Sequence, residues 1–117
     1  MRNTRHHSII VTTNDKAALA KLRLEIIAIY QSKMEAKNGA QLISPIVESL
    51  INNHCSFFIA PDGSKEGYDA SEDGDNVRKH VVSLIESKKD KDGNNVFYYV
   101  EVYYGDDNGK AEILNHN

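Results

Sequence analysis

One apolar stripe constrains the fold of this chain more than any other feature of its sequence. Between Asp15 and Lys37, apolar side chains recur every three or four positions, as they do on one face of an α-helix. The stripe consists of Leu19, Leu22, Ile26, Ile29 and Tyr30. Asn14 or Asp15 suits the capping position before the helix, and Asn38-Gly39 suits its end. A helix with one apolar face has to bury that face against a second layer, so the chain must supply one.

Runs of β-branched and aromatic residues supply that layer. We predict strands over residues 7–13, 41–50, 55–60 and 96–104, with the strand that contains Pro45 at an edge because proline cannot donate a ladder hydrogen bond. A second apolar stripe, made of Val77, Val81, Leu84 and Ile85, predicts another helix, with Ser71, Asp73 or Asp75 as its cap. Residues 61–75 are expected to form a polar loop, and the tail from Gly105 is expected to be flexible.

The order of these elements, β-α-β-β-α-β, is that of a ferredoxin-like α+β sandwich. With 117 residues, 40% of them apolar, the chain is long enough for one domain over residues 1–117. We expect two helices on one face of an antiparallel sheet, with the first and third strands side by side in its centre, the fourth strand beside the first, and the second at the other edge. The other face of the sheet is then open.

Charge and cysteine content narrow the class of partner. Residues 1–37 hold seven Lys and Arg against three Asp and Glu, whereas residues 38–117 hold seven against fourteen. Binding to duplex nucleic acid is therefore disfavoured, because it requires a basic surface.

Cys55 is the sole cysteine and is expected to be a buried side chain. With no disulfide framework, no apolar leader and no long apolar run, we expect a cytoplasmic protein without a membrane contact.

Strand alternation predicts which side chains the open face presents. We expect Cys55, Phe57 and Ile59 to face the helices and Phe58 to face outward. In the last strand, Tyr98, Val100 and Val102 form the more apolar set and are expected inside. Phe97, Tyr99, Glu101 and Tyr103 are then expected on the open face with Phe58. Exposed aromatic area favours an interface, and we expect a homodimer formed through the sheets.

Two His-x-Ser patterns raise an enzymatic alternative. His6 with Ser8, and His54 with Ser56, would meet at one end of parallel central strands. This arrangement resembles the two-histidine phosphoesterases, which implies one imidazole as base, the other as acid, and hydroxyls that hold a phosphate. The alternative function is a phosphoesterase-like or nucleotide-binding protein that acts on cyclic or RNA phosphodiesters.

The polar loop carries a weaker pattern. Asp62, Ser64, Glu66 and Asp73 follow a spacing similar to that of an EF-hand calcium loop, although a strand precedes them and an aspartate stands at the twelfth position. A capped turn leading into the second helix is the simpler interpretation, so we expect no metal and no cofactor. Asp62, Lys65 and Tyr68 are the residues of this loop that we expect to take part in binding.

Several segments together carry a resemblance to a family. They are Ser56–Tyr68 (SFFIAPDGSKEGY), Ser71–Asp75 and Val100–Asp107. They resemble small α+β proteins encoded by bacteriophages and prophages, a family without an assigned activity. The resemblance implies a bacterial cytoplasm during infection. We therefore expect a non-catalytic phage accessory protein that binds a host or defence protein.

Overall fold

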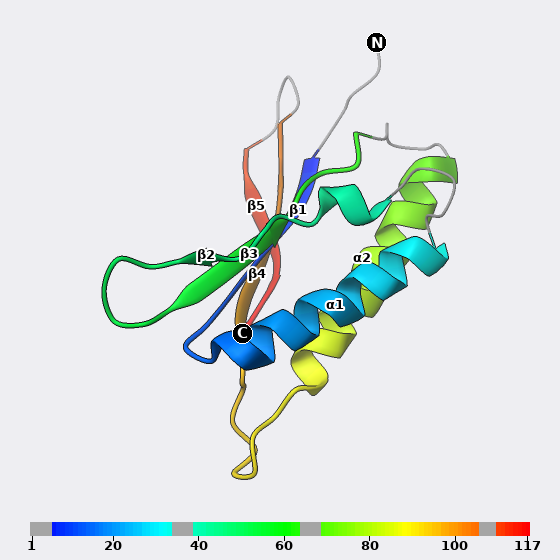
Figure 1. Cartoon of the computed structure of the whole chain (residues 1–117). Coiled ribbons are helices and arrows are strands. Elements are labelled where there is room, and N and C mark those ends of the chain that lie inside the picture. The colour runs from blue at the N-terminus through cyan, green and yellow to red at the C-terminus, as the bar shows by residue number, and fades with distance from the viewer. Residues whose placement is uncertain (1–5, 34–38, 64–68, 106–109) are drawn as a thin grey trace.

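The structure, a computed structural model, describes residues 6–33, 39–63, 69–105 and 110–117. Two helices lie against one antiparallel five-stranded sheet (Figure 1). The elements are β1 (His6–Thr13), α1 (Lys16–Lys33), the 3-10 helix η2 (Gly39–Leu42), β2 (Val47–Glu48), β3 (Cys55–Ile59), α2 (Asp69–Ser87), β4 (Tyr98–Tyr104) and β5 (Glu112–His116). The strand order is β2-β3-β1-β4-β5, which is the order expected of a ferredoxin-like sandwich with one strand added beside β4.

The two central strands run antiparallel, so the expectation that they are parallel was wrong. Val11 of β1 pairs with Phe57 of β3, and Thr13 pairs with Cys55. The connectivity explains this direction: α1 returns the chain so that β2 points the same way as β1, and the β2–β3 hairpin then reverses β3.

β5 forms where a flexible polar tail was expected. Its register with β4 pairs Glu101 with Asn115 and Tyr103 with Glu112, across a bulge between Glu101 and Val102. Amide side chains fasten this polar segment: Asn115 Nδ2 donates to Glu101 Oε1 at 2.7 Å, and Asn117 Nδ2 donates to the Phe97 carbonyl at 2.8 Å. Polar contacts of this kind, between residues far apart in the sequence, leave no hydrophobic pattern, so the sequence analysis did not predict β5.

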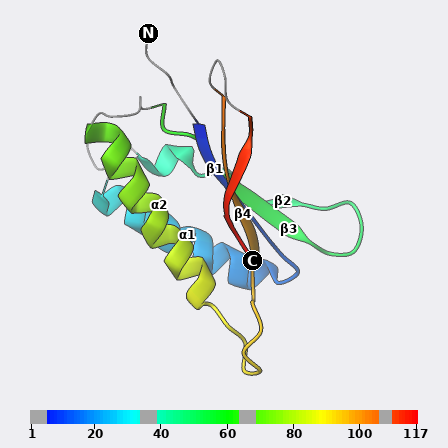
Figure 2. The ribbon, with the colours of Figure 1, turned by 180° about the vertical axis from the view of Figure 1, so that it is seen from behind.

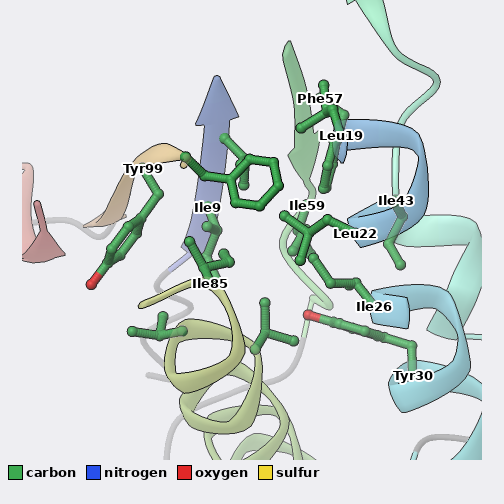
Figure 3. Packing of buried hydrophobic residues seen from close by; sticks show 14 of the residues in the cluster. Ile9, Leu19, Leu22, Ile26, Tyr30, Ile43, Phe57, Ile59, Ile85 and Tyr99 are labelled. Atoms are coloured by element: carbon green, nitrogen blue, oxygen red, sulfur yellow. The ribbon is translucent and has the colours of Figure 1, made fainter. Parts of the chain in front are cut away.

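Both helices cover the same face of the sheet and enclose the core (Figure 3). The α1 stripe is used as expected, with Leu19, Leu22, Ile26 and Tyr30 buried. Asp15 caps α1, since its Oδ1 accepts from the Ala18 amide at 3.0 Å. From α2, Val77, Val81 and Ile85 meet Ile9 and Val11 of β1 and Phe57 and Ile59 of β3 in one cluster.

Several boundaries differ from those expected. α2 begins at Asp69, so Ser71, Asp73 and Asp75 lie inside the helix and none of them is its cap. The segment expected as a strand over 41–50 forms η2 and then only two strand residues. Proline at position 45, which has no N–H to donate to a ladder, lies between the two. Val47 and Glu48 form the strand pairing with β3, and before the proline Ile43 makes an isolated antiparallel bridge to Ile59.

Candidate functional site: the open sheet face

The open face carries apolar side chains from neighbouring strands. Ile10 of β1 is paired with Phe58 of β3 on one side and with Val100 of β4 on the other, which places the three side chains in one row across the sheet. Ile10 and Phe58 are each 43% exposed, whereas their chain neighbours Ile9 and Phe57 are at most 2% exposed. The alternation predicted for β3 is confirmed, and β1 alternates in the same way.

In β4 the predicted alternation was wrong. Phe97, Tyr99 and Glu101 are buried on the helix side, and Tyr103 shares that side, where its ring lies 4.4 Å from the ring of His7. Tyr98 is 63% exposed instead. Of the four aromatic residues expected on the open face, Phe58 alone lies there. The interface expected from the β4 rings therefore has no basis in this structure.

A buried ion network explains why Glu101 lies inside. Arg78 of α2 is 5% exposed and Glu101 is 6% exposed, with Arg78 Nε 4.0 Å from Glu101 Oε2. Arg78 also donates to Asp62 Oδ2 at 3.3 Å and to Asp75 Oδ1 at 2.5 Å. A carboxylate can be buried when a cation and hydrogen-bond donors satisfy it, and here Arg78 and Asn115 do so.

The network also uses the glycine of α2. A Cβ added at Gly74 would collide with the Asp62 carboxylate and lie 3.1 Å from Arg78 Nη1. Because glycine has no side chain, Asp62, in the segment after β3, can approach α2 closely at Gly74 and contact Arg78. One sequence signal could have revealed this network: Arg78 lies four residues before Val82 and seven before Ile85, on the apolar stripe of its helix.

A groove of about 400 Å³ occupies the open face. Ile10 and Phe58 of the apolar row line it, and so do several hydroxyl-bearing residues. The hydroxyl of one of these, Ser56 Oγ, is hydrogen bonded to Thr12 Oγ1 at 2.8 Å. The lining residues are Ser8, Ile10, Ser44, Val47, Ser56, Phe57, Phe58, Val102 and Tyr104. These residues include no acid, histidine, lysine, arginine or cysteine, so the groove offers shape and apolar contact rather than acid-base groups.

The β2–β3 hairpin extends the apolar surface beyond the groove. Its tip projects from the body of the molecule (Figure 1), where Leu50 is 100% exposed and Ile51 is 74% exposed. The turn is well defined: Asn52 and Asn53 take φ values of 66° and 53°, and Ser49 Oγ accepts from the His54 amide at 3.0 Å. Val47, 66% exposed, belongs to both the hairpin and the groove lining.

The structure separates the two predicted histidine pairs. His6 lies at one end of β1, where its ring is 5.5 Å from that of Tyr104. His54 precedes β3 and lines a polar hollow of about 680 Å³ at the other end of the sheet, with Asn14, Asp15 and Tyr98. Because β1 and β3 are antiparallel, roughly 23 Å of strand separates the two ends. Ser8 and Ser56 both line the groove, but the imidazole pair required for phosphoester chemistry is not assembled.

The other candidate residues have structural partners or lie outside the described part of the chain. Asp62 is engaged by Arg78, and Asp73 is an exposed residue of α2. Ser64, Lys65, Glu66 and Tyr68 lie outside the described residues. No group of three or more His, Cys, Asp or Glu side chains suited to a metal ion occurs among the described residues.

The cysteine is buried as expected. Cys55 is 3% exposed, its Sγ lies 3.5 Å from the Thr13 carbonyl, and burial raises the pKa of its thiol. A raised thiol pKa disfavours the thiolate, so Cys55 has the character of a core side chain and not of a nucleophile.

Within the described residues, neither helix has the length and apolar character that crossing a membrane requires.

Comparison with known proteins finds structural neighbours only. No protein-family model and no curated protein matches the chain. Among solved structures, the chain is similar to guanylyl cyclase domains of the RhoGC fusion protein from the aquatic fungus Blastocladiella emersonii. A non-canonical dimeric form is 19% identical with a TM-score of 0.39, and a monomeric mutant form is 18% identical with a TM-score of 0.35. Each match covers 98% of this chain and 71% of the other. At these TM-scores the likeness assigns no activity to this chain.

Proposed function

We propose that this chain is a non-catalytic binding protein and that the open sheet face, together with the hairpin tip, is its contact surface for another protein. The observation that carries the proposal is a set of exposed apolar side chains on one side of the molecule: Ile10, Phe58 and Val47 line the groove, and Leu50 and Ile51 form the tip of the same hairpin, each at least 43% exposed. Exposed apolar residues that gather in this way are typical of interaction sites, whereas scattered single residues are ordinary.

The shape of this surface favours a protein over a small ligand. The groove alone, at about 400 Å³, would suit a small molecule. The tip lies outside the groove, several residues further along the hairpin, and a small molecule in the groove would leave Leu50 and Ile51 exposed. A protein surface can cover both, with aliphatic and aromatic contacts at its centre and the serine and threonine hydroxyls at the rim.

The proposed class of partner rests on the resemblance to phage-encoded proteins. That resemblance supports a host or defence protein of the bacterial cytoplasm as the partner. A phage accessory protein of this kind acts by occupying a surface of its target. The groove lining supports this mode of action because it offers no acid-base groups.

The proposal is tested by capture from bacterial cells with matched surface variants. The Phe58→Glu variant places a charge in the groove at a side chain that is already partly exposed, so the fold is expected to persist. The control is Leu24→Glu, which changes a 64% exposed leucine on α1, away from the sheet face. We expect a protein captured by the wild type and by Leu24→Glu to be lost with Phe58→Glu.

Two outcomes would contradict the proposal. Capture that survives Phe58→Glu and a second change, Leu50→Glu, would place the contact elsewhere. Binding or turnover of a nucleotide or cyclic phosphodiester that disappears in His54→Ala, while Phe58→Glu retains it, would favour the alternative function in the polar hollow.

A further inference from the structure

The polar hollow of about 680 Å³ is built where three connecting segments meet at one end of the sheet. They are the β1–α1 loop, the end of the β2–β3 hairpin and the turn between α2 and β4, and they lie where β1 ends and β4 begins (Figure 2). Asp15 comes from the loop, His54 from the hairpin and Asp90 from the turn. The residues that line the hollow include these two acids and no lysine or arginine.

Short-range hydrogen bonds fix both carboxylates in place. Asp15 Oδ1 accepts from the Ala18 amide at 3.0 Å. Asp90 Oδ1 accepts from the amides of Asp92 and Asn94, at 2.8 and 2.9 Å. Within the part of the chain that the structure describes, neither Asp15 nor Asp90 forms an ion pair with a cationic side chain. A cation from another molecule can therefore pair with them.

The lysines nearest to these acids in the sequence do not fill the hollow. Three of them have partners elsewhere or at its rim, and none of the three lines it. The pairs are Lys16 with Glu48, Lys88 with Glu25, and Lys89 with the side chain of Asn95. Lys91 is exposed in the turn and does not line the hollow either. The negative charge of Asp15 and Asp90 is thus available to a ligand.

An exposed tyrosine ring completes the lining and connects the hollow with the open face. Tyr98 is 63% exposed, and its partner in β1 is Thr12, which is hydrogen bonded to the groove residue Ser56. Cations bind over the face of a tyrosine ring. A guanidinium also stacks flat on such a ring and donates in a fork to carboxylate oxygens, which a lysine ammonium cannot do. Carboxylates and a tyrosine ring around one hollow therefore favour arginine as its occupant.

A phosphate group fits this hollow poorly. Phosphates bind at the first amides of a helix, and at the start of α1 the carboxylate of Asp15 already accepts from one of these amides. The second carboxylate, that of Asp90, would repel a phosphate as well. The charge of the hollow thus disfavours a nucleotide as its ligand.

We propose that the hollow receives an arginine side chain of the partner protein that covers the open face. This inference rests on the proposed function, because it names the chemistry that the partner presents next to its apolar contacts. The partner surface then combines apolar side chains over Phe58 and the hairpin tip with an arginine beside Tyr98. The excess of acids over residues 38–117, fourteen against seven Lys and Arg, agrees with a basic partner.

A titration followed by NMR of the intact protein tests the arginine site without the partner. The probe is Nα-acetyl-arginine amide, and Nα-acetyl-citrulline amide is its uncharged counterpart of similar shape. We expect the arginine probe to shift the amide signals of Asn14, His54 and Asn94. We also expect it to bind about 5-fold more tightly than the citrulline probe, because a charged donor forms the stronger hydrogen bond to a carboxylate.

Two matched variants remove the charges of the hollow and keep its shape. Asp15→Asn and Asp90→Asn retain the Oδ1 acceptors that cap α1 and close the turn, so the fold is expected to persist. Each is expected to weaken binding of the arginine probe by about 2- to 5-fold. Glu112→Gln removes an exposed acid at the opposite end of the sheet and is the control, with no expected effect.

Three results of the titration would overturn the arginine site. The first is equal binding of the arginine and citrulline probes. The second is a set of arginine-induced shifts confined to signals outside the hollow. The third is equal affinity of the control and the two aspartate variants.

Capture from bacterial cells separates this inference from the proposed function. We expect the double variant with Asp15→Asn and Asp90→Asn to lose the partner that the wild type and Glu112→Gln retain. Loss of capture with Phe58→Glu but not with the double variant would overturn the arginine site and leave the proposed function intact. Capture that survives Phe58→Glu and is lost with the double variant would count against the sheet face alone.

Discussion

The two faces of the sheet differ less in residue type than in what covers them. On the helix side, Ile9 and Phe57 are buried together with the charged Glu101. On the open side, Ile10 and Phe58 are as apolar as their neighbours and yet 43% exposed. The difference shows that a carboxylate can belong to the core when another element satisfies it. Conversely, an isoleucine or phenylalanine can remain outside when no element covers it.

The largest expected effect comes from breaking the ion network that makes the covered face possible. Arg78→Leu leaves Glu101 and Asp62 without their cation in a buried site, and we expect the free energy of unfolding to fall by about 3 to 5 kcal/mol. Urea denaturation measures this. Lys79→Leu, at the exposed neighbouring position, should change it by no more than about 0.5 kcal/mol. Similar small losses for both variants would show that Arg78 has no special role.

The comparison between the faces is sharpest at two adjacent isoleucines of β1. Ile9→Ala removes a fully buried side chain and is expected to cost about 2 to 5 kcal/mol of unfolding free energy. Ile10→Ala removes a partly exposed one and is expected to cost less than about 1 kcal/mol. Both values come from the same denaturation experiment. Equal costs would mean that the strand does not alternate between a covered and an open face.

The covered face should also respond to alkaline pH. Burial raises the pKa of Tyr30 from 10.0 to about 12, with Arg78 acting in the opposite direction. The folded state thus favours the neutral phenol. Its contribution is complete below pH 10 and is lost as the pH rises from 10 to about 12, an upper bound of about 3 kcal/mol. Denaturation across this range should show a smaller loss for Tyr30→Phe than for the wild type; identical losses would exclude this tyrosine as the cause.

The smallest of these effects has an unusual sign. Alanine in place of a helical glycine normally stabilises a helix by roughly 0.5 to 1 kcal/mol. At Gly74 the added Cβ would displace Asp62 from Arg78, so we expect a net loss of about 1 to 2 kcal/mol. Thermal unfolding measures it. A stabilised Gly74→Ala variant would mean that the Asp62 contact contributes little.

Local patterns in the sequence account for much of the fold. The spacing of Leu19, Leu22, Ile26 and Tyr30 predicted α1 and its buried side, and the element order predicted which strands are neighbours. Pattern alone did not predict the β4 alternation, because the partner of Glu101 is Arg78, 23 positions earlier in the sequence.

The remaining errors have the same origin. β5 is held to β4 by amide side chains, which hydrophobic periodicity does not register. The histidine hypothesis is the exception: the predicted order of helix and hairpin already makes the first and third strands antiparallel, and the hypothesis treated them as parallel. The sequence therefore predicted that the candidate site is the open face of the sheet. Of the aromatic residues that it assigned to this face, only Phe58 lies there.

Hydroxyl-radical labelling of the intact protein, read by peptide mass spectrometry, tests the assignment of the faces most directly. In each of two adjacent pairs, one ring lies on the exposed side and the other in the core: Phe58 and Phe57 on β3, and Tyr98 and Tyr99 on β4. We predict strong modification of Phe58 and Tyr98 and little of Phe57 and Tyr99. Stronger modification of Tyr99 than of Tyr98 would mean that Tyr99 lies on the outer surface, and it would contradict the assignment of the two faces.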